Sequence, residues 1–211
     1  MSESRVRQVN AAGRMELPAP TTNGSMPLEA AIGRRRSRRS FRAEPLALAD
    51  LSQLLWAAQG VTNPAGFRAA PSAGALYPLE LYVVAGHVEG LASGVYRADV
   101  SGAALDHVQS GDERQALARI ALHQDWMVDA PVIIAVAAVF ERTTAKYHAR
   151  GERYVHIEAG CAVQNVYLQA TALGLGTTVV GAFDDEAVQR RLGMAERERP
   201  LALLPVGRYQ D

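Results

Sequence analysis

Five arginines and one serine, Ser37, fill positions 34–39 of the chain. Positive charges this close together repel one another unless an anion lies near them. Guanidinium groups bind phosphate through paired hydrogen bonds, and a serine hydroxyl adds a neutral donor to the same oxygens. This arginine run, residues 34–39, therefore predicts a site for a phosphate-bearing ligand. A solvated charged face and a patch that binds nucleic acid are the alternatives.

Two glycine-containing segments have the composition of ligand loops. Residues 71–78 read PSAGALYP, in which small residues between two prolines let the backbone approach a flat ligand closely. Gly181 and Ala182 follow a predicted strand, and Gly181 leaves room for a ligand above the backbone. An ordinary surface loop and an ordinary turn are the alternatives. Arg208 is an isolated arginine that matters only if the fold brings it to the arginine run.

Lys146 and Tyr147 lie in a polar stretch, residues 141–153, which we expect to be a loop. The reference pKa values of both side chains are about 10, so both are poor bases at neutral pH. A desolvated, cationic site lowers both pKa values, and one of the two groups could then remove a proton during a redox reaction. Two solvated loop residues are the alternative.

Other catalytic chemistries find no support in the sequence. The five histidines form no HExxH pair and are not spaced with carboxylates as metal ligands are. Cys161 lies in an apolar helical pattern, where a buried thiol is the usual state, and there is no GxSxG motif. We therefore expect neither a metal site nor a nucleophilic serine or cysteine.

The elements that must position these groups follow from hydrophobic periodicity. Helices are predicted at 28–32, 48–59, 112–124, 154–173 and 184–192, and strands at 79–85, 94–96, 104–108, 132–140, 177–182 and 201–206. Apolar residues surround the helix at 154–173, so it must be buried on several sides, within its own core or in a dimer. The pattern predicts a mixed α/β or α+β fold, with one sheet covered by helices.

Composition limits the classes of protein to which the chain can belong. Its 211 residues, 48% of them hydrophobic, suffice for one core, so we expect a flexible arm at 1–25 and a single domain at 26–211. Lys+Arg and Asp+Glu both total 22, so no net charge draws the chain to nucleic acid or to an anionic membrane. No segment resembles a signal peptide or reaches the roughly 20 apolar residues of a membrane span. With one cysteine and no disulfide framework, the cytoplasm is the expected location.

Several motifs, taken in order, resemble the nitroreductase family of FMN flavoproteins. They are RRSRRSF, APSAGALYP, AKYHARGERYVHIEAG, QNVYLQATALGLGTTVVGAF and PVGR, and the resemblance runs from about Leu17 to Arg208. More narrowly, the motifs are similar to those of azoline dehydrogenases, which oxidise thiazolines and oxazolines in ribosomally made peptides. The resemblance implies an α+β nitroreductase-like fold with a mostly antiparallel central sheet flanked by helices. It also implies a homodimer whose long buried helices pack together at the interface.

The resemblance assigns cofactor roles to individual residues. Two FMN sites would be built at the interface from both chains. Five residues would hold the FMN phosphate and ribityl chain: Arg35, Arg36, Ser37, Arg39 and, closing on the phosphate, Arg208. Arg34 and Arg38 would then be solvated. The isoalloxazine would be lined by a second set, made of Pro71, Ser72, Ala73, Gly74, Ala75 and Tyr77.

Two further features complete the implied site. Backbone N–H groups at Gly181 and Ala182 would face the N5 and O4 edge of the flavin, and Lys146 and Tyr147 match the pair proposed as base in the azoline branch. Many nitroreductases have Asn and Gln where this chain has Ala75 and Tyr77. Backbone contacts must therefore replace side-chain hydrogen bonds to the ring at these two positions.

Three functional hypotheses follow. The leading one is an FMN-dependent dehydrogenase that converts an azoline to an azole in a peptide or peptide-like small molecule. O2 is a candidate electron acceptor for it, and a cyclodehydratase is a candidate partner. The second is an NAD(P)H-dependent reductase of nitro compounds or quinones. The third is a module without enzymatic activity, whose arginine run contacts nucleic acid or an acidic partner.

Overall fold

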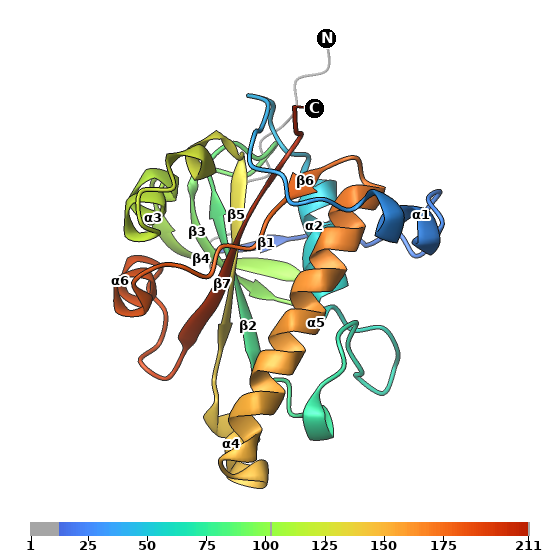
Figure 1. The fold of residues 1–211 in the computed structure, drawn as a ribbon, viewed down its shortest axis with the longest axis vertical. Helices are drawn as coiled ribbons and strands as arrows, with labels where there is room; N and C mark the ends of the chain where they lie inside the picture. The colour runs from blue at the N-terminus through green and yellow to red at the C-terminus, as the bar shows by residue number, and fades with distance from the viewer. Residues whose placement is uncertain (1–12, 102, 211) are drawn as a thin grey trace.

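A seven-stranded sheet forms the centre of the computed structural model, which describes residues 13–101 and 103–210 (Figure 1). The strand order is β1-β4-β3-β2-β5-β7-β6, and each pair of neighbouring strands is antiparallel. The strands are β1 (Arg14–Glu16), β2 (Leu79–Ala85), β3 (Gly94–Asp99), β4 (Ala104–Ser110), β5 (Val132–Ala138), β6 (Gly176–Thr177) and β7 (Arg199–Gly207). The expectation of a mostly antiparallel sheet is confirmed.

Strand β5 lies between β2 and β7, and its sequence VIIAVAA accounts for this central position. All seven residues are buried, and valine and isoleucine favour the pleated conformation. Alternate side chains of a strand point to opposite faces. Ile134 and Val136 therefore join one hydrophobic core, while Ile133 and Ala135 join another. A strand with apolar side chains on both faces requires helices on both sides of the sheet.

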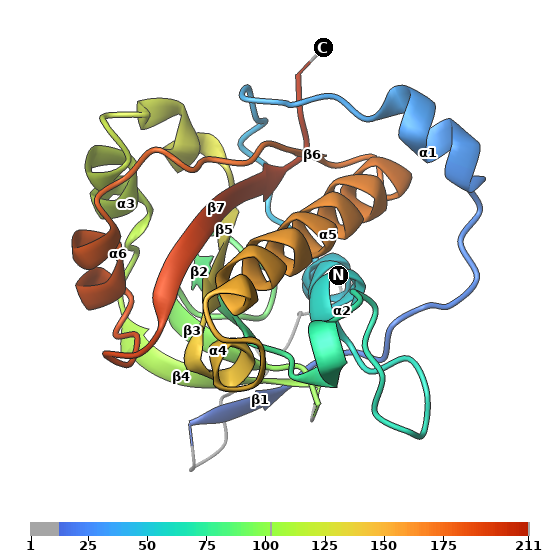
Figure 2. The ribbon, with the colours of Figure 1, turned by 60° about the horizontal axis from the view of Figure 1, so that its bottom comes forward.

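Helices cover both faces and give the molecule three layers (Figure 2). On one face, α2 (Leu48–Gln59) and α5 (Arg150–Ala172) pack against the core that contains Ile134. On the other face, α3 (Arg114–Ile120), the 3-10 helix η2 (Asp125–Asp129) and α6 (Asp185–Arg191) pack against the core that contains Ile133. The short helices α1 (Leu28–Arg34) and α4 (Glu141–Tyr147) lie near opposite ends of α5 (Figure 1).

Helix α5 is buried on one side in this single chain. Val155, Ala162 and Val166 are fully buried against the sheet, whereas Ile157 on the outer side is 56% exposed. The expected burial on several sides is therefore incomplete within one chain. No helix in the described part of the chain is both long and apolar enough to cross a membrane.

Part of the expected N-terminal arm belongs to the sheet. Residues 14–16 form the edge strand β1, which pairs with β4. Met15 is 3% exposed, and the Arg14 guanidinium lies 2.6 Å from Asp99 and 2.9 Å from Asp106. These partners are more than eighty residues away in the sequence, so the local composition of the arm does not reveal them. Residues 1–12 of the arm lie outside the described residues.

Two further elements differ from the predictions. The stretch at 141–153, expected to be a loop, contains α4 and the first turn of α5, separated by a turn at His148 with φ +52°. The strand expected at 177–182 is reduced to β6 and an isolated bridge between Val180 and Leu203. In this register Thr178 lies opposite Pro205, which has no N–H to donate to the ladder, and the Val179 N–H, on the other side, donates to the Tyr167 hydroxyl.

Candidate functional site

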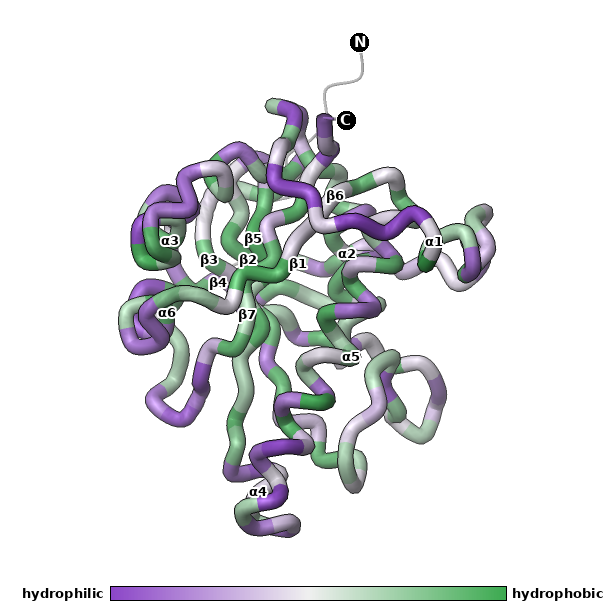
Figure 3. The backbone as a smooth tube through the Cα atoms, viewed as in Figure 1, coloured by the Kyte–Doolittle hydropathy of each residue, from purple (hydrophilic) through white to green (hydrophobic). Residues whose placement is uncertain are grey.

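The arginine run begins with the last residue of α1, Arg34, and continues as an extended segment, visible in Figure 3 as a strongly hydrophilic stretch of the tube. The Arg38 N–H donates to the Thr177 carbonyl at 3.0 Å, and Ser37 forms a parallel bridge to Thr177 beside β6. Alternate side chains of an extended segment point to opposite sides. Arg35 and Ser37 both face Tyr167 of α5: the guanidinium lies 5.3 Å from the ring centroid and the Ser37 Oγ lies 3.3 Å from the Tyr167 Oη. The guanidinium of Arg39 lies 6.0 Å from the ring centroid of Trp126.

Arg36 points away from Arg35 and Ser37. Its Nη1 donates to the carbonyls of Gly33 and Arg35, and it lines a separate pocket of about 150 Å³ with Arg34 and Arg38. Arg38 was expected to be solvated. In the structure its guanidinium instead lies 4.1 Å from the ring centroid of Tyr209. The sequence suggests that the side chains of the run form one cluster. In the structure, alternate side chains of the run instead point to opposite sides.

Arg208 lies at the C-terminal end of α5. Its Nη1 donates to the Leu173 carbonyl at 2.9 Å, and its Nη2 lies 3.8 Å from the Asp50 carboxylate. A cation suits this position because the carbonyls that end a helix carry partial negative charge. A Cβ on Gly174, which lines the pocket of Arg36, would lie 3.2 Å from Arg208 Nη1. Arg208 therefore lies beside the pocket of Arg36.

Tyr167 connects the arginine run to the segment that leads to Gly181, and sequence reasoning missed it. The side chain is 6% exposed, and its hydroxyl accepts the Val179 N–H at 2.7 Å while lying 3.4 Å from the Thr178 Oγ1. A buried tyrosine hydroxyl needs hydrogen-bond partners. The tyrosine within the apolar QNVYLQA pattern was therefore a sequence signal that this residue binds other segments of the chain.

Gly181 and Ala182 form an exposed ledge after this segment. A Cβ built on Gly181 would meet no atom within 4 Å, so the space above the backbone is open. The chain then enters α6 through Asp184, whose carboxylate accepts the Ala187 N–H at 2.9 Å. The ledge is therefore fixed on one side by Tyr167 and on the other by a helix cap.

The 71–77 loop meets Lys146 and Tyr147. Within it, η1 (Ala73–Ala75) contains Gly74 with φ +64°. A Cβ on Gly74 would lie 2.9 Å from the Tyr147 Oη and 3.0 Å from the Lys146 Nζ, distances that need the neighbours to move. The positive φ therefore favours glycine here, and an added Cβ would displace the ends of the Tyr147 and Lys146 side chains. Lys146 is exposed and Tyr147 half-buried in the single chain.

A buried polar cluster supports the loop from below. The Ser72 Oγ accepts the Tyr77 N–H at 2.9 Å, and the Ser72 hydroxyl also bonds to the Glu158 carboxyl of α5. Glu158 is 3% exposed, and burial raises its pKa against the opposing effects of Ser72, Arg68 and the side-chain amide of Gln59. Its Oε1 has no hydrogen-bond partner among the described residues. Sequence reasoning missed Glu158, although a carboxylate inside an apolar helical pattern was a visible signal.

The expected site residues thus form two groups on one chain. Tyr167 contacts the first group, which contains Arg35 and Ser37, and Glu158 contacts the second, which contains the 71–77 loop. Tyr167 lies nine positions after Glu158 on α5, about 14 Å along the axis at 1.5 Å per residue. Lys146 and Tyr147 lie beyond Glu158, at the N-terminal end of α5 (Figure 1).

Comparison with known proteins decides the family. The sequence profile described as Nitroreductase family matches residues 32–208, most of the chain. The chain belongs to the nitroreductase family. As a nitroreductase-family protein it is an FMN-dependent oxidoreductase.

Individual relatives agree with this family. A Methanocaldococcus jannaschii protein, provisionally named as a nitroreductase, is 44% identical over 194 residues, which are 92% of this chain and 96% of the relative. A Ralstonia eutropha crystal structure with the same provisional name is 30% identical with a TM-score of 0.83, covering 94% of this chain and 90% of the other. A chain of the Escherichia coli microcin synthetase McbBCD complex has a TM-score of 0.71 at 24% identity, covering 93% and 79% of the two chains. That similarity shows the fold alone.

Two observations fit FMN to this nitroreductase-family chain. Arg35, Ser37 and Arg39 offer charge-assisted and neutral donors for a phosphate. Open space above Gly181 and the tight approach at Gly74 suit backbone contact with a flat ring. Within the described residues, no group of three or more His, Cys, Asp or Glu side chains could hold a metal ion.

Proposed function

We propose that this enzyme oxidises an azoline ring to an azole in a peptide or a peptide-like small molecule. The supporting observation is the position of Lys146 and Tyr147, whose polar atoms lie about 3 Å from where a Cβ on Gly74 would lie. Gly74 belongs to the loop that we propose lines the flavin. Two proton-transfer groups beside that loop are what oxidation of a carbon centre needs, whereas a simple reductase site does not require them.

The reaction removes one proton and one hydride from the ring, so the electron pair leaves together with the second hydrogen. When bound, FMN supplies the acceptor for the electron pair. We propose that Lys146 or Tyr147 takes the proton from a ring carbon, and that the 71–77 loop orients the ring for this transfer. Azolines arise when a cysteine, serine or threonine side chain condenses with the preceding amide. A cyclodehydratase is therefore the class of partner that this proposal implies.

We propose further that two copies of the chain form each site. Arg35, Ser37 and Arg39 of one copy would bind the FMN, and the partner copy would supply the 71–77 loop. The two groups of site residues lie at different positions along α5, which supports this arrangement. Apolar surface supports it as well: Ile157 of α5 and Leu28 and Ile32 of α1 are all more than half exposed. Beside them, a groove of about 430 Å³ runs between α1, α2 and α5.

NAD(P)H-dependent reduction of nitro compounds or quinones is the second candidate. The provisional name of the 44% identical relative favours it. This chemistry needs an accessible flavin, and the exposed ledge at Gly181 and Ala182 is consistent with that access. The two candidates differ in whether Lys146 and Tyr147 are needed.

The deciding experiment compares the wild-type holoenzyme with a double variant, Lys146→Ala and Tyr147→Phe. A thiazoline-containing peptide is the first substrate, with loss of two hydrogen atoms followed by mass spectrometry. NADPH with a nitroaromatic compound is the second. We expect the double variant to retain FMN and to lose thiazoline oxidation by about a hundredfold or more, the usual scale of general base catalysis.

Arg153→Gln, which changes an exposed charge on α5, serves as the control and should retain both activities. Full thiazoline turnover by the double variant would show that the base is assigned wrongly. A wild-type enzyme that leaves thiazolines unchanged but reduces nitroaromatics would support the second candidate instead.

A further inference from the structure

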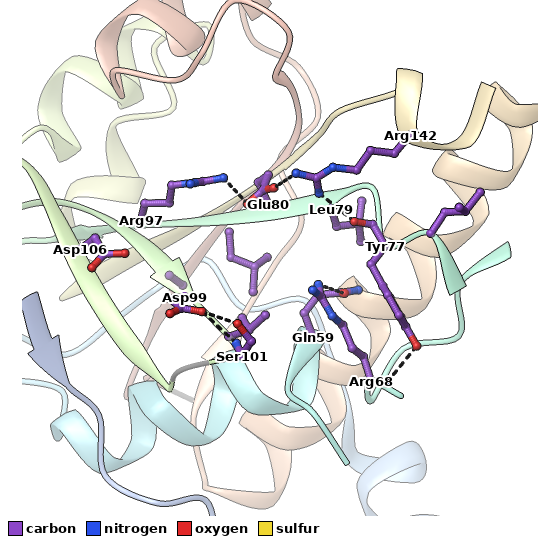
Figure 4. Close-up of a pocket in the computed structure, with 14 residues that line it drawn as sticks. Gln59, Arg68, Tyr77, Leu79, Glu80, Arg97, Asp99, Ser101, Asp106 and Arg142 are labelled. Atoms are coloured by element: carbon purple, nitrogen blue, oxygen red, sulfur yellow. Dashed lines mark hydrogen bonds and ion pairs between the residues drawn. The ribbon is translucent and has the colours of Figure 1, made fainter. Parts of the chain in front are cut away.

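A polar cavity of about 540 Å³ is lined by Leu76 and Tyr77 at the end of the 71–77 loop (Figure 4). The cavity volume is within the range of small-molecule sites. Part of its wall is apolar, formed by Leu79, Leu81 and Ala98. The remainder is charged, with three arginines and three carboxylates: Arg68, Arg97, Arg142, Glu80, Asp99 and Asp106.

The carboxylates of the wall already have cationic partners. The Glu80 carboxylate forms ion pairs with both Arg97, at 2.8 Å, and Arg142, at 2.5 Å. Figure 4 shows this shared contact, with the two arginines approaching Glu80 from opposite sides. Asp99 and Asp106 both form ion pairs with Arg14 of β1. Arg97 also lies 3.4 Å from Glu198, so two carboxylates, Glu80 and Glu198, offset Arg97 and Arg142, and this group adds little net charge to the cavity.

Arg68 differs from the other two arginines because none of the described carboxylates lies within 4.0 Å of its guanidinium. The guanidinium lies 4.5 Å from the ring centroid of Tyr77, and its Nη1 donates to the Gln59 Oε1 at 3.2 Å. Glu80 and Glu158 act on it from longer range, and burial lowers its pKa. A half-buried guanidinium without a close counterion is costly, so an anion in the cavity would stabilise it.

Gln59 also lines the cavity, and its side chain is fully buried. Its Oε1 accepts from Arg68, and its side-chain amide acts on the buried Glu158 carboxyl, whose pKa it lowers. Arg68 is therefore the donor of the cavity wall that lacks an anionic acceptor among the described residues.

We propose that this cavity binds the carboxylate of a small organic anion, such as an amino acid or a short peptide, through Arg68. Arg68 is the one arginine of the wall with no described carboxylate within 4.0 Å, and its planar guanidinium matches the two oxygens of a carboxylate. A phosphate dianion would need a second free cation. The apolar body of the ligand packs against Leu79 and Leu81. This binding site is distinct from the proposed redox reaction and does not depend on it.

The site touches the catalytic loop through Tyr77. The Tyr77 carbonyl accepts from Arg142, and Arg142 lies four residues before Lys146 on α4, so the two side chains share a helix face. An occupant beside Tyr77 is therefore positioned to influence the same loop that meets Lys146 and Tyr147.

The test is calorimetric titration of the FMN-loaded protein with N-acetylleucine and with N-acetylleucinamide. The two probes differ only in whether they carry a carboxylate or a neutral amide. We expect the acid to bind at least about tenfold more tightly than the amide, as a charge-assisted bidentate contact gives. Arg68→Gln should abolish this preference. Arg153→Gln, outside the cavity, should preserve it.

Equal affinity for the two probes, or no binding of either at about 10 mM, would overturn the proposal. Binding of inorganic phosphate in place of the acid would overturn the assignment to carboxylates. If Arg68→Gln does not fold, Arg68→Lys keeps the charge but loses the planar fork, and should weaken binding of the acid while leaving the amide unchanged. The readout is binding alone, so failure of the azoline proposal would not affect it.

Discussion

The Tyr167 hydroxyl accepts a hydrogen bond from the backbone N–H of Val179 at 2.7 Å. The same hydroxyl lies 3.3 Å from the Ser37 Oγ, in a segment 130 residues earlier in the chain. One buried side chain of α5 therefore fixes both the arginine run and the segment that leads to Gly181. These are two of the segments to which the family resemblance assigns FMN contacts.

We predict that Tyr167→Phe weakens both the fold and FMN binding. The substitution leaves the Val179 N–H without its side-chain acceptor, and the loss of a hydrogen bond costs about 0.5–1.5 kcal/mol in the free energy of unfolding. Urea denaturation of the apoprotein measures this change, and quenching of FMN fluorescence measures affinity. Tyr154→Phe is the matched control on the same helix. Equal behaviour of the two variants would show that the Tyr167 hydroxyl has no structural role.

Arg35→Gln should reduce FMN affinity by about tenfold to a hundredfold, because it removes a charge-assisted hydrogen-bond donor on the side of the run that faces Tyr167. It should also make binding less sensitive to salt. Arg34→Gln removes the same charge one position earlier, on an exposed side chain that lines the other pocket. Fluorescence titration at two salt concentrations measures both effects. A larger loss in Arg34→Gln would contradict the division of the run into two sides.

Gly74→Ala tests the contact between the 71–77 loop and α4. An alanine there must adopt φ +64° and displace the Tyr147 hydroxyl and the Lys146 amine. Gly66→Ala is a close control, because Gly66 has φ +82° and open space around its Cβ position. Both variants should lose about 1 kcal/mol of stability from the left-handed conformation. Only Gly74→Ala should also lose turnover, and equal turnover of the two variants would argue against a catalytic role for this contact.

The pH dependence of stability should reveal Glu158. Because burial raises its pKa in the folded protein, folded Glu158 keeps its proton at pH values where the unfolded chain has lost it. Its contribution to stability is therefore present below the usual glutamate pKa of about 4.3 and is lost as pH rises through the raised value. Glu158→Gln does not titrate, so its stability relative to wild type should increase over that interval.

Urea unfolding of Glu158→Gln and of wild type between pH 4.5 and 8 measures this difference. Glu152→Gln, an exposed glutamate on the same helix, controls for the loss of a charge. A difference between Glu158→Gln and wild type that stays constant, or that falls with rising pH, would contradict the assignment.

The sequence by itself determined the elements with strong local periodicity and the order of the family motifs. The structure confirms the predicted bounds of α2, Leu48–Gln59, and of β2, Leu79–Ala85. Their patterns are regular, and turn-prone residues end each of them. The motifs were sufficient for the nitroreductase family because their residue types and order are local properties of the chain.

Contacts between distant residues were decided by tertiary structure alone. Residues 14–16 became a strand because Arg14 and Met15 find partners in β3, β4 and the core. Arg35 and Arg36 are adjacent and identical in type, yet they point to different sides. The bridge between Ser37 and Thr177 of β6 holds this backbone extended, so neighbouring side chains alternate in direction. Glu158 and Gln59 became important because packing removed water from them. Side-chain direction and desolvation depend on which distant surfaces come together, and the local sequence does not contain that information.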